Sequence, residues 1–173
     1  GHHRATSPDR QMKFEHLVEI NDLLNPLIDT LTREQLWRGL VMRAEAPQDF
    51  VMALDECHIV ERNADEMVRE LRFGSLLIRD RVRFEGGTHV HYRTESPAEH
   101  AGALLTMSIE EPQPAQLFVR FRYDHAGADT GDAAGSFYDE FRRSAYVEAD
   151  IDTIRTIRRY AGEGRLDGPP ASS

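Results

Sequence analysis

The sequence predicts an α+β domain in which a curved, seven-stranded antiparallel sheet packs against helices, the last of them long. Six segments of alternating or β-branched residues follow one another in the middle of the chain, separated only by short turns. A seventh such segment stands near the start of the chain, and residues 136–161 form a helical stretch of roughly 25 residues. Turns this short exclude parallel crossovers, so the six strands are expected to form an antiparallel meander.

Each element has a local signal. The first strand is expected over residues 13–20, which alternate between apolar and polar positions. Thr32 begins a helix with Gln35 as its capping-box partner, and Pro47 ends that helix and opens a short second one. Ser136 is expected to cap the long C-terminal helix. The six later strands are expected at residues 56–62, 67–73, 76–85, 88–95, 103–110 and 116–124.

Composition limits the possible functions. With 173 residues, 40% of them hydrophobic, the chain fits one globular domain. We place this domain at residues 13–166. Residues 1–12 are expected to be a disordered or non-native leader, and residues 167–173 a disordered tail. A formal charge of −9 argues against nucleic acid as a partner, and no stretch is long and apolar enough to span a membrane. The single cysteine, Cys57, is expected to be a buried structural thiol. A cytoplasmic monomer or homodimer is expected.

Two glycine-containing turns determine which side chains share a face of the sheet. If both are two-residue turns, Arg69 lies opposite Asp80, and Asp80 lies opposite Arg93 on the next strand. The same count places His91 on that face. A polar group of Arg69, Asp80, His91 and Arg93 is therefore expected on a mostly apolar face, which is how small-molecule pockets are built.

This polar group has two interpretations. In the first, Asp80 orients the arginines, and one guanidinium points at a carbonyl or carboxylate of a ligand. In the second, the group is a buried ion network that only fixes the strand register. His91 is either a proton donor or a histidine that merely lines the sheet. A metal site with His89 is not favoured, because no third ligand clearly converges on the pair.

Four further residues are expected to line the same pocket: Tyr123, Phe121, Met107 and Phe141. The Tyr123 hydroxyl could contact a ligand, although a core tyrosine with one satisfied hydroxyl is the commoner case. The chain has no serine-nucleophile motif, no phosphate-binding glycine loop and no paired zinc-ligand motif. No catalytic residue is therefore assigned, and neither a cofactor nor a metal is expected.

Four stretches of the chain resemble one family of the START-like (SRPBCC) superfamily. They are residues 36–40 (LWRGL), 68–74 (VRELRFG), 99–107 (EHAGALLTM) and 144–154 (SAYVEADIDTI). The order of elements also resembles the helix-grip fold of that superfamily, which includes birch-pollen-allergen-like proteins, lipid-transfer domains and polyketide cyclases. The most similar branch is a family of unknown function that includes a protein of the acetylaranotin biosynthesis cluster, and the likeness covers roughly residues 13–166.

The resemblance implies a cavity between the sheet and the C-terminal helix, binding of an apolar or aromatic small molecule, and in some branches cyclisation or dehydration. It transfers no catalytic residue. We therefore expect a small-molecule-binding protein. One alternative is a cyclase or dehydratase in which His91 acts as acid–base and an arginine stabilises an enolate. The other is a protein-interaction domain with a packed core.

Overall fold

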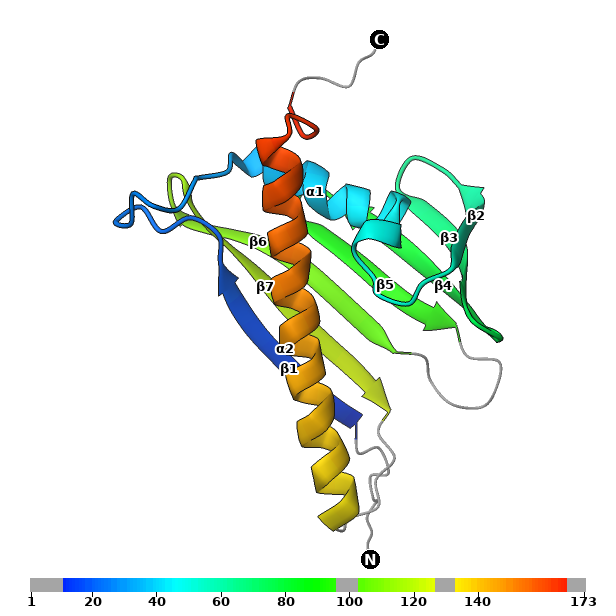
Figure 1. Cartoon of the computed structure of the whole chain (residues 1–173). Coiled ribbons are helices and arrows are strands. Elements are labelled where there is room, and N and C mark those ends of the chain that lie inside the picture. The colour runs from blue at the N-terminus through cyan, green and yellow to red at the C-terminus, as the bar shows by residue number, and fades with distance from the viewer. Residues whose placement is uncertain (1–10, 96–102, 127–132, 168–173) are drawn as a thin grey trace, which may run out of the picture.

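A seven-stranded antiparallel sheet curves around one long helix (Figure 1). The computed structural model describes the backbone of residues 11–95, 103–126 and 133–167, and the side chains of residues 13–95, 103–124 and 140–167. The strands are β1 (Gln11–Glu19), β2 (Glu56–Arg62), β3 (Glu66–Phe73), β4 (Leu76–Glu85), β5 (His89–Glu95), β6 (Leu104–Gln113) and β7 (Gln116–Ala126). The helical elements are α1 (Arg33–Glu45), η1 (Pro47–Asp49) and α2 (Ala133–Gly162).

The strand order confirms the predicted meander. Strands β2 to β7 pair with their sequence neighbours, and β1 joins the sheet beside β7, which gives the order β1-β7-β6-β5-β4-β3-β2. Every pairing is antiparallel. This is the predicted helix-grip architecture. The expected leader and tail lie almost wholly outside the described residues, although β1 already begins at Gln11.

The helices agree with the sequence in part. Thr32 and Gln35 form the predicted capping box, with the Thr32 Oγ1 accepting from the Gln35 amide at 3.0 Å and the Gln35 Oε1 accepting from the Thr32 amide at 2.9 Å. The predicted second helix is only a three-residue 3₁₀ turn, η1, after which the chain turns through Ala53 at a φ of 69°. Helix α2 begins at Ala133, so Ser136 lies inside it and is not its cap.

The hydrophobic core fills the end of the concave face that α1 covers. Helix α1 crosses α2 at Gly39, where a Cβ would lie 2.6 Å from the Ile157 Cγ2, so the two helices approach closely because this residue has no side chain. The buried apolar residues below this crossing include Leu36, Leu40, Val82, Val90, Val119, Ile154 and Tyr160. Within the described ranges, no helix has the length and apolar character needed to cross a membrane.

Helix α2 presents a different face to the sheet from the one expected. Its buried side includes Asp150, Thr153 and Ile157, whereas Phe141 is 66% exposed. Phe141 precedes the half-buried Tyr146 by five residues, which is about 140° around a helix. The prediction that Phe141 lines the pocket is therefore wrong, because its side chain faces solvent.

Candidate functional site

The hairpin of β3 and β4 has the predicted register, and Arg69 lies opposite Asp80. The Arg69 Nε and Nη2 donate to the Asp80 Oδ1 and Oδ2 at 2.9 and 2.6 Å, and the Nη1 donates to the Ala44 carbonyl at 2.9 Å. Burial disfavours the charge of Arg69, but the hydrogen bonds to Asp80 and the attraction to its charge and to neighbouring groups together outweigh burial and raise the pKa of Arg69. Every nitrogen of this guanidinium is engaged within the protein, so the pair fastens the end of α1 to the sheet.

The next hairpin is displaced by one residue from the prediction. Gly86 and Gly87 both adopt positive φ, at 60° and 69°, and Thr88 completes a three-residue turn by donating to the Glu85 carbonyl at 3.0 Å. Val82 therefore pairs with Tyr92, whereas His91 was expected there. A shift of one residue moves every side chain of a strand to the other face.

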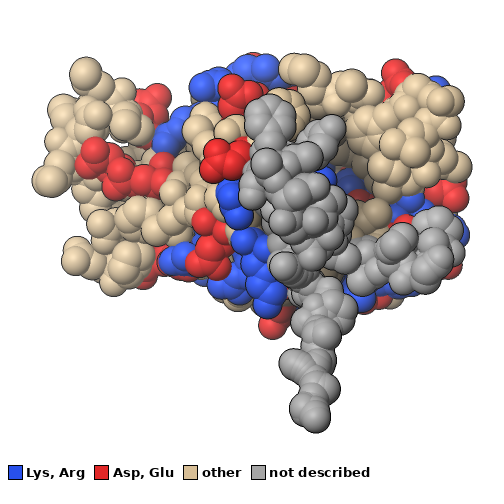
Figure 2. Space-filling view, turned by 90° about the horizontal axis from the view of Figure 1, so that it is seen from below, with Lys and Arg blue, Asp and Glu red and all other residues tan. Residues whose placement is uncertain are grey.

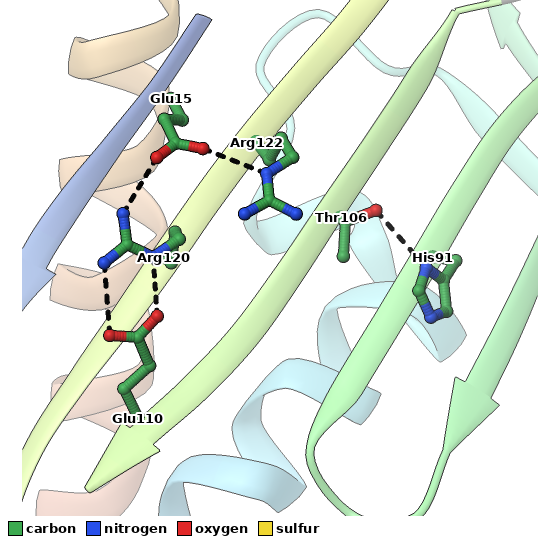
Figure 3. Close-up of polar contacts among 6 residues, drawn as sticks. All are labelled: Glu15, His91, Thr106, Glu110, Arg120 and Arg122. Atoms are coloured by element: carbon green, nitrogen blue, oxygen red, sulfur yellow. Dashed lines mark hydrogen bonds and ion pairs between the residues drawn. The ribbon is translucent and has the colours of Figure 1, made fainter. Parts of the chain in front are cut away.

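His91 and Arg93 consequently lie on the outer face of the sheet, and their predicted place in the concave polar group is wrong. His91 contacts the Thr106 Oγ1 at 3.3 Å and the Glu85 carboxylate at 2.8 Å, and it stacks on His89 with ring centroids 5.6 Å apart. Figure 3 shows His91 projecting from the sheet on the side away from the helices. Among the described residues, no group of three or more histidines, cysteines and acids is placed to hold a metal.

Ion pairs cross this outer face from strand to strand (Figure 3). Arg120 donates to Glu110 on β6 at 2.5 Å and to Glu15 on β1 at 2.9 Å, and Arg122 donates to the same Glu15 at 3.0 Å. The pairing with Arg122 and Arg120 lowers the pKa of Glu15. Such exposed pairs contribute little stability each. The outer face is thus a solvated surface that holds the strands in register.

A second buried polar group lies between α2 and the opposite half of the concave face. Asp150 has no exposed surface; its Oδ1 accepts from the Tyr123 hydroxyl at 2.5 Å, and its Oδ2 lies 2.7 Å from the His16 Nε2. Burial raises the pKa of Asp150, although the hydrogen bonds from Tyr123 and His16 oppose the rise. Burial and the neighbouring carboxylate also raise the pKa of Tyr123. The hydroxyl of Tyr123 is therefore satisfied within the protein.

Sequence reasoning missed Asp150. It stands among charged residues, and its neighbours Glu148 and Asp152 have the spacing of a solvated helix edge. The available signal is its spacing of four from Ile154 and seven from Ile157, which places all three on one helical stripe. An acid on the apolar stripe of a helix is the pattern that predicts a buried functional or structural carboxylate.

Arg43, near the end of α1, was also missed. Its Nε donates to the Thr153 Oγ1 at 3.2 Å, and its guanidinium carbon lies 5.1 Å from the centroid of the Tyr92 ring. Arg69 lies 5.3 Å from the same ring. We call His16, Arg43, Tyr92, Tyr123, Asp150 and Thr153 the polar band. Its two tyrosines, Tyr92 and Tyr123, also belong to the hydrophobic core.

Aromatic side chains and a hollow border the polar band. Tyr146 stacks on Tyr123 with ring centroids 3.7 Å apart, and Phe14 lies 5.5 Å from His16. A hollow of about 400 Å³ opens where β1 and β7 pair, at the edge of the sheet: Phe14 and Tyr123 line it from the concave side, and Lys13, Glu15, Arg122 and Asp124 line it from the outer face. The predicted pocket residues Met107 and Phe121 face the concave side, and both are fully buried.

Two further hollows, of about 490 and 440 Å³, border the C-terminal half of α2. In the larger one Arg158 donates to the carbonyls of Asp29 and Ile20, so its guanidinium is engaged by the backbone. Of these three hollows, the one beside Tyr123 adjoins the polar band. Figure 2, which views the molecule from below, shows acidic and basic side chains interspersed rather than gathered by sign.

Solved structures share this fold at low sequence identity. The Zhui aromatase/cyclase from Streptomyces sp. R1128 has a TM-score of 0.62 at 11% identity, with 88% of this chain and 96% of that chain covered. The di-domain ARO/CYC StfQ from the steffimycin biosynthetic pathway has a TM-score of 0.67 at 11% identity, with 88% of this chain covered. This chain spans about half of StfQ, 52% of its length. Ara h 8.0201 has a TM-score of 0.59 at 9% identity, with 86% of this chain and 99% of that chain covered.

Sequence comparison identifies the family. A search of curated proteins finds no match. A family model described as acetylaranotin biosynthesis cluster protein L (AtaL) matches residues 18–164, which include both helices and every strand in whole or in part. The chain therefore belongs to the acetylaranotin biosynthesis cluster protein L family, within the START-like superfamily.

Proposed function

We propose that the chain binds a small apolar or aromatic molecule against the concave face of the sheet, beside α2. The observation that carries this proposal is the polar band, which places buried hydrogen-bonding groups on an otherwise apolar face beside the partly buried rings of Phe14 and Tyr146. Ligand sites are commonly built in this way, from apolar walls and a few placed polar groups. The fold shared with aromatase/cyclases and with Ara h 8.0201 supports the same proposal.

The walls suit a flat ligand. Phe14, Leu105 and Tyr146 face the space between the sheet and α2, and each is only partly buried. Their exposed surface contrasts with that of Val82 and Val119 at the other end of the sheet, which are fully buried. An aromatic ligand would cover this remaining apolar area and stack on the rings.

Native mass spectrometry tests the proposal directly. Freshly purified protein is expected to carry a reproducible small apolar adduct, which denaturing extraction would release. Tyr146→Ala is expected to lower the adduct occupancy, whereas Phe141→Ala, a matched aromatic truncation on the exposed side of α2, should leave it unchanged. A bare mass in every variant, together with no binding of the neutral aromatic probe 2-naphthamide up to millimolar concentration, would refute the proposal.

A cyclase or dehydratase activity is the second candidate, favoured by the chain of contacts from Tyr123 through Asp150 to His16. Burial raises the pKa of Asp150, so this carboxyl holds a proton more readily than a solvated acid does. Asp150 would act through Tyr123: the Tyr123 hydroxyl would give its proton to the leaving hydroxyl and take one from the protonated Asp150, and His16 would remove a carbon-bound proton. This pair replaces His91, which lies on the outer face.

Heptane-2,6-dione is a simple probe of this second candidate. Removal of a proton from the C1 methyl group allows C1 to attack the C6 carbonyl, and loss of one water from the resulting hydroxyketone gives 3-methylcyclohex-2-enone, whose absorbance is followed. His16→Ala is expected to abolish any turnover, and His91→Ala should retain it. Equal rates in both variants and in buffer would leave ligand binding alone as the proposal.

A further inference from the structure

The guanidinium of Arg43 is held in place, and the only carboxylate that attracts it, among the described residues, is Asp150, which does not touch it. Its Nε donates to Thr153 on α2 at 3.2 Å, and the group lies over the Tyr92 ring at 5.1 Å. Within the described residues, no hydrogen bond engages its two terminal nitrogens. Arginine carries five donors in a rigid planar fork, and a half-buried fork with free donors calls for an acceptor.

The acids nearby are already engaged. Asp80 receives two hydrogen bonds from Arg69, and both oxygens of Asp150 are occupied by Tyr123 and His16. Arg43 thus has no carboxylate in direct contact, in contrast to Arg69. The position of Arg43 is also not explained by attraction to the C-terminal dipole of α1. Its side chain extends to Thr153 on α2, and it is Arg69 that donates to the carbonyl of Ala44 at the end of α1.

Tyr92 supplies an independent observation. Its side chain is buried, with 6% of the residue exposed, and its hydroxyl has no hydrogen-bond partner among the described residues. Buried hydroxyls almost always have a partner, because leaving one unpaired is costly. Arg43 lies over the ring that carries this hydroxyl. A hydroxyl without a hydrogen-bond partner and a cation without a carboxylate in contact are therefore neighbours on the concave face.

We propose that Arg43 and Tyr92 bind an acidic oxygen of the ligand, so that the ligand is an aromatic or apolar molecule carrying a carboxylate, phenolate or enolate. This inference rests on the proposed binding function and names the chemical class of its ligand. The fork of Arg43 suits a planar anionic oxygen pair, and Tyr92 donates its hydroxyl hydrogen to the same group. Thr153 acts as a positioning residue by orienting the guanidinium.

A pair of isosteric probes separates this inference from simple apolar binding. 2-Naphthoate and 2-naphthamide have the same ring system and nearly the same shape, and only the first is an anion. Their affinities are measured by fluorescence titration for the wild-type chain, Arg43→Gln, Tyr92→Phe and Arg33→Gln. Arg33→Gln is the matched control, since it removes the same charge from the first turn of the same helix, where Arg33 pairs with Glu111.

We expect the wild-type chain to bind 2-naphthoate about tenfold to a hundredfold more tightly than 2-naphthamide. Arg43→Gln should abolish this preference without changing the affinity for 2-naphthamide, Tyr92→Phe should reduce it, and Arg33→Gln should preserve it. A chain of charge −9 repels anions at long range, so such a preference has to arise locally.

Several results would overturn the inference, and they are distinguishable. Equal affinity for both probes, or a preference that survives Arg43→Gln, would refute the role of Arg43 and Tyr92 and leave the binding function intact. No binding of either probe up to millimolar concentration would refute both. A lower unfolding midpoint in Arg43→Gln with unchanged probe preference would show that Arg43 is only structural, and it would count against the inference.

Discussion

The ion pair between Arg69 and Asp80 can be tested by removing one partner. Arg69 is 3% exposed, and Asp80→Ala would remove the two charge-assisted hydrogen bonds that its guanidinium makes to Asp80. Stranding one member of a buried pair costs about 3–5 kcal/mol. With a urea m-value of about 2 kcal/mol per molar, a loss of about 4 kcal/mol lowers the unfolding midpoint by about 2 M.

The same hairpin provides a matched control. Glu70 and Arg79 occupy the next register position on the opposite face, 3.8 Å apart, with side chains 35% and 48% exposed. Glu70→Ala should therefore cost less than about 1 kcal/mol. Urea unfolding is followed by the fluorescence of Trp37, the only tryptophan of the chain.

The double variant Arg69→Met/Asp80→Leu checks the cause of the loss. Replacing both charges by apolar side chains of similar volume removes the desolvation cost of each, so the double variant should be more stable than Asp80→Ala. A loss below about 1 kcal/mol in Asp80→Ala would refute the reasoning, because it would mean that water solvates the Arg69 guanidinium after all.

Three other predictions follow from described contacts. Gly39→Ala should destabilise the chain by about 1–3 kcal/mol in the same unfolding assay, because the added Cβ would overlap Ile157. Gly162→Ala is the control and should be nearly neutral, because no atom lies within 4 Å of the added Cβ. Burial raises the pKa of Asp150 above its ordinary 3.8, so its contribution to stability is full below that pH and is lost as pH rises through the native pKa. The free energy of unfolding of Asp150→Asn should therefore rise relative to that of the wild type as pH increases above about 4, and a difference that stays constant with pH would contradict this. Burial also raises the pKa of Cys57, so its modification by a disulfide reagent at pH 8 should be more than about tenfold slower in the native than in the urea-unfolded chain, and equal rates would contradict the shift.

The two hairpins show how far local sequence determines register. Residues 74–75 form the expected two-residue turn, so Arg69 and Asp80 meet as predicted. The turn after β4 contains two adjacent glycines, both of which adopt positive φ, and Thr88 extends it by one residue. Two glycines are compatible with loops of several lengths. The sequence therefore does not fix the number of residues in this turn, and that number decides on which face of the sheet His91 lies.

The polar band shows the same limit for helices. The long helix was evident from its length and composition, but the side that it presents to the sheet depends on where α1 crosses it at Gly39. That crossing is a tertiary contact, which places Asp150 inside and Phe141 outside. Arg43 was missed for a related reason, since a cation in the last turn of a helix normally needs only the helix dipole to explain it.

The pairing of β1 with β7 has a consequence for synthesis on the ribosome. Strand β1 is made first, but its hydrogen-bonding partner ends at Ala126, and His16 meets Asp150 only 134 residues further along the chain. The segment made first therefore exposes an unpaired strand edge while the meander forms from its local hairpins. We infer that the sheet closes last, at the β1–β7 seam, and that variants weakening this seam should lower the yield of folded protein more than their equilibrium stability suggests.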